Sequence, residues 1–356
     1  MGAVTVVSTP DDGSCGIGTY TGELLDEFPS EVTVTWVTVP LRSPNPLPYL
    51  VASIRAGLTD DPTIHVQHEY GIYGPKSLWS WLFFPVLLVL ANLRGRRVVV
   101  TFHSAWNDET IGPPLVRLKR LYVAANNRLL AATADHAVFL SDNAADAFQR
   151  SVSLRSVETI PHGVQVETRS LSKSEARRQL GYESEEPLVV LPGYIRPEKG
   201  CDAFVAVAER FDTPFVLAGG CQDAPDYCES LAASAPDNVA ITGHLDEDAF
   251  HAAFVAADVV LLPYREVTQS GVFNWCVAYG VPVVGSDTPY FRSLADEWGC
   301  VEVVETSDPD AAADRIRSLL TDDERRDALR DGMADYRTAA SMANVGRRHV
   351  EIYAPD

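Results

Sequence analysis

The stretch PYREVTQSGVFNWCVAYGVPVVGSD, from Pro263 to Asp287, is the part of the sequence that most constrains the fold. It follows one short apolar run, Val259–Leu262, and ends in another, Val281–Gly285. Between them lie the charged Glu266, the polar tripeptide Gln269-Ser270-Gly271 and an apolar segment of helical length. This order predicts a strand, a polar loop, a buried helix capped by Ser270, and a second strand.

The same alternation of strand-like and helix-like segments extends along the whole chain. Strands are expected at Val4–Ser8, Val32–Val39, Thr63–Gln67, Arg97–Phe102, His136–Leu140, Val157–Ile160, Leu188–Pro192, Phe215–Ala218, Val239–Thr242, Val259–Leu262, Val281–Gly285 and Cys300–Val304. Helices are expected between them, among others at Gly18–Glu27, Lys173–Leu180, Ala203–Phe211 and Asp246–Ala256. Two such series predict an α/β protein of two doubly wound, Rossmann-like domains that face a cleft, with ligands at the carboxyl ends of the strands. The joint is expected within HGVQVETRSLSKSEARRQL.

Composition narrows the class of protein. The net charge is −20, and only four of the 29 basic residues are lysines. An acid-rich, lysine-poor surface suits high salt, which screens self-repulsion, so we expect a halophilic protein; an ordinary acidic protein is the alternative. Such a charge argues against nucleic acid as a partner.

The start, MGAVTVVSTP, has no basic segment of a signal peptide, so we expect a cytoplasmic protein. The six cysteines form no CxxC pair and are expected to be buried free thiols rather than zinc ligands.

One segment departs from the pattern. Residues 77–93 carry no charge and would form a helix of about 26 Å, shorter than the ~30 Å hydrocarbon core of a membrane. The neighbouring residues 94–128 hold seven basic and two acidic side chains. A buried helix is favoured, and partial insertion into an anionic membrane surface or a full span are the alternatives.

Polar residues that follow the predicted strands are candidates for a site. In GYIRPEKG, Gly193 allows a close approach to a ligand, and Arg196 and Lys199 offer cations to phosphate. The amides of Ser270 and Gly271, at a helix end, would bind an anion. Glu266 would accept hydrogen bonds from sugar hydroxyls, or else pair with a neighbouring arginine.

The first half of the chain has its own candidates. Gly16 and Gly18 open a helix after the first strand, whereas His68, Glu69 and His103 follow later strands. Each histidine alone could equally be structural. The acidic string 246–248 begins a helix, so an N-cap explains it better than a metal clamp does.

Together these motifs resemble the retaining glycosyltransferases of family 4, which have the GT-B fold. The resemblance rests on nine motifs in the family's order: GIGTYTGELL, VQHEYGIYG, TFHS, IPHGV, GYIRPEKG, FVLAGG, ITGHLDEDAF, AADVVLLPYREVTQSG and YGVPVVGSD. PYREVTQSG looks most like a mannosyltransferase-like subgroup. The resemblance implies domains at 1–165 (acceptor side) and 166–337 (nucleotide-sugar side), and a helix within 338–356 that crosses back to the first domain.

The resemblance also implies roles for single residues. His103, Arg196, Lys199 and Glu266 would be catalytic; Gly16, Gly18, Gly193, Ser270, Gly271 and Asn274 would bind the donor; Tyr20, His68 and Glu69 are candidates for the acceptor side. The family's second glutamate falls on Asn274, a neutral acceptor that should hold the nucleotide ribose more weakly.

The implied reaction moves a hexose, with mannose favoured, from a nucleotide-diphosphate sugar to a glycan or lipid-linked acceptor in polysaccharide assembly. GDP-mannose is the favoured donor, and no obligatory metal or other cofactor is expected. The protein would be cytoplasmic, with peripheral contact to an anionic membrane through residues 77–128. The alternatives are another GT-B enzyme such as a sugar-nucleotide epimerase, or a degenerate member that only binds sugar nucleotide.

Overall fold

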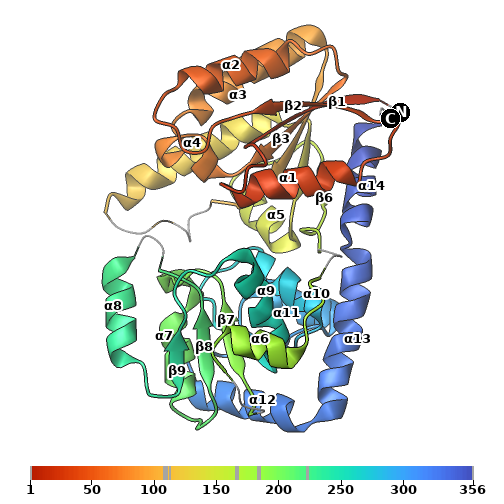
Figure 1. Cartoon of the computed structure of the whole chain (residues 1–356). Coiled ribbons are helices and arrows are strands. Elements are labelled where there is room, and N and C mark those ends of the chain that lie inside the picture. Colours follow the sequence, from red (N-terminus) through yellow and green to blue (C-terminus); the bar gives the residue numbers. More distant parts are fainter. Residues whose placement is uncertain are drawn as a thin grey trace. The chain divides into compact units, whose positions relative to one another are not determined.

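The computed structural model describes residues 2–106, 111, 114–164, 168–182, 186–221 and 224–354. The chain forms two compact units. Unit 1 consists of Met1–Gly163 together with Met342–Asp356, and unit 2 is Val164–Ser341. Each unit is built on a parallel six-stranded sheet with helices on both faces (Figure 1).

The sheet of unit 1 has the strand order β2-β1-β3-β4-β5-β6. Its strands are β1 (Ala3–Ser8), β2 (Thr33–Thr38), β3 (Thr63–His68), β4 (Arg97–Phe102), β5 (His136–Phe139) and β6 (Val157–Thr159). Its helices are α1 (Gly16–Asp26), α2 (Leu47–Gly57), α3 (Ser80–Arg94), α4 (Val116–Thr133), α5 (Asp142–Gln149) and α14 (Met342–Tyr353), with short 3-10 turns η1 (Tyr70–Ile72) and η2 (Pro75–Ser77).

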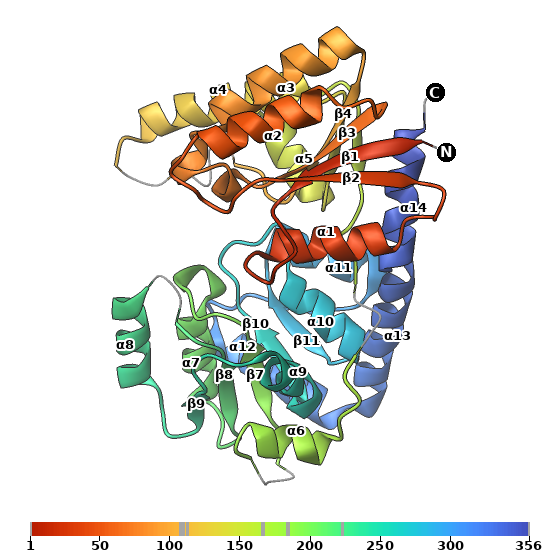
Figure 2. The same ribbon diagram turned by 45° about the horizontal axis from the view of Figure 1, so that its top comes forward.

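The two faces of this sheet have different neighbours, because successive side chains of a strand alternate between faces. Ile64 and Val66 of β3 point into a core made with α2, α3, α4 and α5. The other face meets α1 and α14, where Val99 and Val138 pack with Tyr20 and Val345. Figure 2 shows α1 and α14 side by side, and α2, α3 and α4 grouped apart from them.

The sheet of unit 2 has the strand order β12-β11-β10-β7-β8-β9. Its strands are β7 (Val189–Pro192), β8 (Phe215–Ala218), β9 (Val239–Ile241), β10 (Val259–Leu262), β11 (Val283–Ser286) and β12 (Glu302–Val304). Its helices are α6 (Lys173–Gln179), α7 (Cys201–Ala208), α8 (Pro225–Ser234), α9 (Glu247–Ala256), α10 (Gly271–Tyr279), α11 (Pro289–Trp298), α12 (Pro309–Thr321) and α13 (Asp323–Ala339), with the 3-10 turn η4 (Pro197–Lys199).

The fold class predicted from the sequence is confirmed. Each of the twelve expected segments contains a strand, and the stretch after Ser270 forms the buried helix α10. The Ser270 hydroxyl accepts a hydrogen bond from the Phe273 amide (3.1 Å) and so caps this helix, as expected. Asp246 caps α9 in the same way through the amide of Ala249 (2.8 Å). The last helix, α14, belongs to unit 1.

The prediction for the cysteines was wrong at two positions. Cys221, which follows β8, forms a disulfide with Cys228 of α8. Helix α8 begins only four residues after Cys221, so its first turn brings Cys228 back to the end of the strand. This spacing matches no sequence signature of a disulfide. Of the others, Cys201, Cys276 and Cys300 are buried free thiols, and Cys15 is half-buried.

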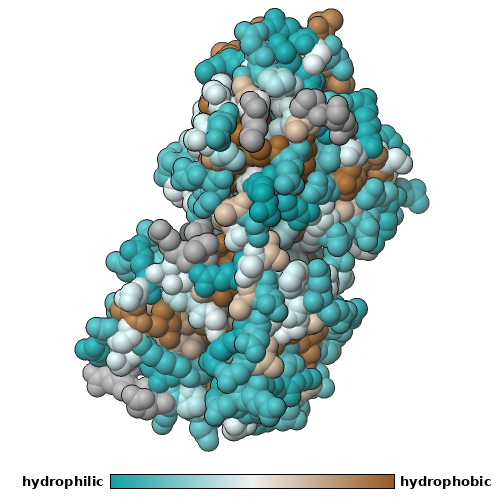
Figure 3. Space-filling model, turned by 90° about the vertical axis from the view of Figure 1, so that its right-hand side faces the viewer, coloured by the Kyte–Doolittle hydropathy of each residue, from teal (hydrophilic) through white to brown (hydrophobic). Residues whose placement is uncertain are grey.

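The charge-free segment at 77–93 begins at the last residue of η2 and forms most of α3, which is only half-buried. Phe83, Phe84 and Leu87 lie in the core of unit 1, whereas Trp81, Val89 and Leu93 are exposed. Over the described residues, no helix is both long and apolar enough to cross a bilayer. Elsewhere the surface agrees with the acidic composition: hydrophilic residues cover most of the face seen in Figure 3, with small hydrophobic patches between them.

Candidate active site

Lys199 is the centre of the candidate site in unit 2. It lies on η4, in the loop that leaves the carboxyl end of β7. Gly193 has a φ of 98°, a backbone conformation that favours glycine, and a Cβ placed there would lie 2.8 Å from the Lys199 ammonium. At Gly200 a Cβ would collide with the Pro263 carbonyl. The two glycines therefore allow this loop to lie tightly against the ends of β7 and β10.

The electrostatic environment of Lys199 favours an anionic ligand. Its ammonium lies over the Tyr264 ring, 5.6 Å from the centroid. In the described part of the chain, no carboxylate lies within ion-pair distance of it. Burial lowers the pKa of Lys199 to about 8, and the nearby Arg196 charge acts in the same direction. A half-buried cation that forms no ion pair with a described residue would be stabilised by an anion such as a diphosphate.

Glu266 lies on the loop after β10 and is exposed. The neighbouring Arg265 does not hold it, because that guanidinium pairs with Asp202 and donates to the Pro197 carbonyl (3.1 Å). Among the described residues no cation forms an ion pair with Glu266. The ion-pair alternative for Glu266 is therefore not what the structure shows, and its carboxylate is available to a ligand.

Lys199, Glu266, Ser270 and Gly271 line one cavity of about 270 Å³ at the carboxyl-terminal edge of the unit 2 sheet. Gly271 is the first residue of α10, whose amino end opens on this cavity. The unpaired amides and the dipole of a helix amino end favour negative charge. A cation, a carboxylate and a helix end are thus brought together within one unit.

Arg196 and Asn274 lie outside the lining of this cavity. Arg196 is at the start of η4, 3.5 Å from the Glu198 carboxylate. Asn274 is buried on the first turn of α10, with 4% of its surface exposed. Sequence reasoning missed Tyr264, whose ring lies beneath Lys199; its position two residues before Glu266 carried no signal of that role.

His103 is the central candidate in unit 1. It follows β4, is 7% exposed, and its Nε2–H donates to Gln67 Oε1 (2.8 Å). The Tyr20 ring meets it edge-on at a centroid distance of 5.2 Å. Burial, together with the nearby His162, His68 and His349, lowers the pKa of His103 well below its usual value. The ring is therefore neutral at physiological pH.

Glu69 lies beside His103 at the same edge of the sheet. Its carboxylate accepts hydrogen bonds from the Ser104 hydroxyl and from the Gly71 amide (3.3 Å). Burial raises the pKa of Glu69, against the effect of these hydrogen bonds and of the Arg42 charge. Ser104 was missed by the sequence reasoning, although it directly follows His103.

His68 and Tyr20 lie in the interior rather than at a ligand surface. The His68 ring is fully buried among the rings of Tyr70, Tyr73 and Phe84, and burial lowers its pKa to about 3. Tyr20 is 2% exposed and packs on His103. His68 is therefore a core histidine in this structure, and neither residue offers a surface to an acceptor.

Gly16 and Gly18 form the start of α1, after β1. A Cβ on Gly18 would lie 2.0 Å from the Pro10 carbonyl oxygen, so glycine lets the helix begin against the end of the strand. Nothing lies within 4 Å of a Cβ placed on Gly16. The Gly16 backbone is thus open to a ligand, whereas Gly18 has a packing role.

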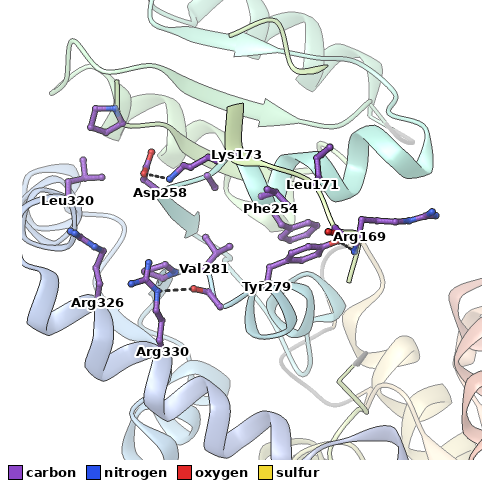
Figure 4. Close-up of a pocket in the computed structure, with 16 residues that line it drawn as sticks. Arg169, Leu171, Lys173, Phe254, Asp258, Tyr279, Val281, Leu320, Arg326 and Arg330 are labelled. Carbon is purple, nitrogen blue, oxygen red and sulfur yellow. Dashed lines mark hydrogen bonds and ion pairs between the residues drawn. The ribbon is translucent and has the colours of Figure 1, made fainter. Parts of the chain in front are cut away.

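A larger cavity, about 550 Å³, lies at the opposite edge of the unit 2 sheet (Figure 4). It is lined by Asp258 and Pro282, which directly precede β10 and β11, and by Pro187, two residues before β7. Lys173 pairs with Asp258, and Arg330 donates to the Gly280 carbonyl (3.3 Å). Its cations are engaged in the fold and ligands of such sheets bind at the carboxyl ends, so we place the candidate site in the smaller cavity. Across the described ranges no cluster of three or more His, Cys, Asp or Glu could hold a metal ion.

Comparison with known proteins identifies the family of the chain. The family description "Glycosyl transferases group 1" matches residues 172–334, and "Glycosyltransferase Family 4" matches residues 15–168. A solved structure of Anabaena Alr3699/HepE in complex with UDP aligns with a TM-score of 0.77 over 98% of this chain and 99% of that one, at 14% identity. The fold is therefore that of the GT-B glycosyltransferases. Together, these matches show that the chain belongs to glycosyltransferase family 4.

Curated relatives agree with this membership. A 2-deoxystreptamine N-acetyl-D-glucosaminyltransferase of Streptomyces fradiae is 27% identical over 71% of this chain and 63% of its own length. A phosphatidyl-myo-inositol mannosyltransferase of Mycobacterium leprae is 32% identical over 53% of this chain and 49% of its own. The matched part of the chain thus spans 63% and 49% of the length of these relatives.

Proposed function

We propose that this protein is a retaining glycosyltransferase that moves a hexose from a nucleotide-diphosphate sugar to a glycan or lipid-linked acceptor, in polysaccharide assembly. The observation that carries the proposal is the cavity in unit 2 that joins Lys199, Glu266 and the amino end of α10. The ammonium and the helix end would stabilise the charge that develops on the leaving diphosphate. Glu266 would accept hydrogen bonds from hydroxyls of the transferred sugar, and Arg196 would add charge near the diphosphate.

The proposal assigns the donor to unit 2 and the acceptor to unit 1. His103, neutral and buried, would contact the reacting sugar, and Glu69 with Ser104 would bind acceptor hydroxyls. The Gly16 backbone would approach the donor phosphate. Because Lys199 and a helix end would face the diphosphate, with the charge of Arg196 nearby, the proposal needs no metal ion and no other cofactor.

Mannose, carried as GDP-mannose, is the donor we favour, because two relatives are named as mannosyltransferases, one of them as GDP-mannose-dependent. HepE was solved with UDP, so the nucleobase is the first thing to measure. Isothermal titration of GDP, UDP and ADP in molar KCl should give clear binding of one nucleotide, and turnover of its sugar should require an acceptor. Sugar release or isomerisation without acceptor dependence would favour an epimerase. No binding to a folded sample would favour a degenerate member, with the buried Asn274 as the first suspect.

Unit 1 carries the surface features expected for contact with an anionic membrane. Of the thirteen exposed large hydrophobic residues among those described, twelve lie between positions 41 and 121. We call this the apolar face; it comprises Leu41, Leu47, Val51, Ile54, Leu58, Leu78, Trp81, Val89, Leu93, Leu115, Leu118 and Leu121. Exposed basic residues adjoin it on α4, at 117, 119 and 120. Apolar side chains beside basic ones favour an anionic bilayer.

The basic residues before β4 contribute less to this face than the sequence suggests. Arg94 and Arg96 pair with Asp60, at 2.6 and 3.7 Å, and Arg97 donates to the Ile352 carbonyl (2.5 Å). We therefore choose α4 for the test. A double variant with Leu118→Ser and Leu121→Ser should bind phosphatidylglycerol vesicles at least about tenfold more weakly than the wild type. Tyr194→Ser, the exposed hydrophobic residue outside this segment, is the control. Unchanged vesicle binding of the α4 variant would remove the proposed peripheral localisation at the cytoplasmic membrane.

The proposed environment is high salt. The net charge of −20 and the four lysines support it, because self-repulsion of an acidic surface falls as salt screens it. The melting temperature should rise steadily between 0.1 and about 3 M KCl. A melting temperature that is flat over this range would indicate an ordinary acidic protein.

A further inference from the structure

A chain of buried polar side chains connects His103 to the last turn of α14, on the face of the unit 1 sheet that meets α1 and α14. Gln67 Oε1 lies 2.8 Å from His103 Nε2, and Gln67 Nε2 lies 3.5 Å from His65 Nε2. His65 Nε2 is also 2.7 Å from Thr101 Oγ1, and His65 Nδ1 is 2.5 Å from the Tyr353 hydroxyl. His65, Gln67 and Thr101 are fully buried.

The register of the sheet explains why these residues meet. β3 and β4 pair in parallel, with Gln67 opposite Thr101. Because side chains alternate along a strand, His65 and Gln67 share one face of β3, and Thr101 and His103 continue the same face of β4. Tyr353 reaches that face from α14. These polar groups hydrogen-bond to one another, as buried polar groups must to avoid a large desolvation cost.

With the Gln67 amide oriented as in the structure, the donors and acceptors of this chain follow in turn. Gln67 Oε1 can only accept, so His103 carries its proton on Nε2. The Gln67 amide nitrogen can only donate, so His65 Nε2 bears a lone pair, which also accepts from the Thr101 hydroxyl. His65 then carries its proton on Nδ1 and donates to Tyr353. Burial lowers the pKa of both histidines well below the usual value, so each ring holds one proton.

We propose that Gln67 is a positioning residue that holds the proton of His103 on Nε2 and leaves its lone pair on Nδ1, and that His65 and Tyr353 fix the orientation of the Gln67 amide. If His65 instead carried its proton on Nε2, the amide would turn over and donate to His103, whose proton would move to Nδ1. The last turn of α14 therefore sets which nitrogen of His103 accepts a hydrogen bond. This inference rests on the proposed function only in giving His103 a contact with the reacting sugar.

The primary test measures the proton position itself. In protein labelled with ¹⁵N-histidine, the nitrogen shifts of His103 should report the Nε2–H form across pH 6–8. Gln67→Leu removes the acceptor and should give a mixture of the two forms. Tyr353→Phe removes the acceptor of the His65 proton. Although Tyr353 does not hydrogen-bond to His103, this change should shift the tautomer equilibrium of His103 towards the Nδ1–H form. Tyr49→Phe, which removes another buried hydroxyl of unit 1 that bonds to the Pro40 and Ile72 carbonyls, is the matched control and should change nothing.

Activity gives a second readout. Gln67→Leu and Tyr353→Phe should lower kcat between about tenfold and a hundredfold, with KM for the donor nearly unchanged. Gln67→Glu should retain the Nε2–H form but raise the pKa of His103. The kcat of this variant should therefore fall at acidic pH, where the ring becomes protonated, in a range where the wild-type kcat does not fall. The titratable groups that face His103 are His65, His68, His162 and His349, whose pKa values are all lowered, and Tyr20, whose pKa is raised.

The outcomes separate this inference from the proposed function. An Nδ1–H form of His103 in the wild-type protein, or a proton position that neither Gln67→Leu nor Tyr353→Phe changes, would overturn it. The predicted tautomer changes with an unaltered kcat would uphold the proton placement and overturn the role of His103 in the reaction. Because Gln67→Glu and Tyr353→Phe are nearly isosteric, the test does not depend on a variant that fails to fold.

Discussion

The carboxyl-terminal edges of the two sheets hold their polar residues in opposite ways. In unit 2, Lys199 and Glu266 project from loops that follow the strands, and neither has an ion-pair partner within the described ranges. In unit 1, the buried His103 and the half-buried Glu69 lie at the strand ends and are hydrogen-bonded to their neighbours. Unit 2 therefore offers charge to a ligand, whereas unit 1 offers a fixed arrangement of donors and acceptors. We therefore expect substitutions at the two edges to affect different properties of the protein.

The largest effect is expected from Lys199→Ala, which removes the cation of the unit 2 cavity. If the ammonium stabilises the leaving diphosphate, kcat should fall on the order of a thousandfold, as for loss of a preorganised transition-state contact. The thermal unfolding curve should stay the same, because in the described structure Lys199 makes no ion pair that the fold needs. Steady-state kinetics and calorimetry on one sample would measure both.

The matched control is Lys173→Ala, another of the four lysines, at the opposite edge of the same sheet. Its ammonium pairs with Asp258, so its loss should affect stability slightly and turnover little. If Lys199→Ala turned over as fast as Lys173→Ala, the assignment of the unit 2 cavity would be wrong.

The second effect belongs to unit 1 and concerns stability in acid. His68 is fully buried, its ring nitrogens have no hydrogen-bond partner in the structure as described, and burial lowers its pKa to about 3. In the unfolded chain its pKa is about 6.5. Above pH 6.5 the ring is neutral in both states and costs the fold nothing. As pH falls from 6.5 towards 3, the unfolded chain binds a proton that the buried ring does not, so the free energy of unfolding decreases by about 1.4 kcal/mol for each pH unit.

The variant His68→Leu removes this dependence while filling a similar volume. Its free energy of unfolding should match the wild type near pH 7 and exceed it by about 2 kcal/mol at pH 5, as measured by denaturant titration at each pH. His244→Leu, at an exposed position, is the control and should follow the wild-type curve. Parallel curves for His68→Leu and the wild type would mean that His68 reaches solvent.

The same contrast explains what the sequence could and could not predict. Residues on loops, such as Lys199 and Ser270, are marked by glycines, caps and a change from strand to helix patterning, so their places after the strands could be predicted. For a residue within a strand, burial and contacts depend on which face of the sheet its side chain occupies. His68 shares a face with Ile64 and Val66, so the alternation of β3 already placed it in the core.

Gln67 and Tyr353 illustrate a further limit of sequence reasoning. Gln67 lies on the same strand as His68 but on the other face, and only the pairing of β3 with β4 brings it to His103. Tyr353 is 288 residues from His65, and its contact depends on the return of α14 to unit 1. Neither contact has a local signal, because both are set by tertiary packing.

The smallest effect returns to unit 2 and concerns the charge of Lys199. Its pKa of about 8 lies below that of an ordinary lysine, chiefly because the ammonium is buried. Below pH 8 the ammonium is charged and can bind a diphosphate, and above pH 8 it progressively loses its proton. Affinity for the nucleotide diphosphate should therefore fall about tenfold between pH 8 and pH 9.5, measured by titration calorimetry. In Lys199→Arg the guanidinium stays charged throughout, so its affinity should be weaker at pH 7 but flat over this range. A wild-type affinity as flat as that of Lys199→Arg would mean that the diphosphate is held by Arg196 and the α10 amides without Lys199.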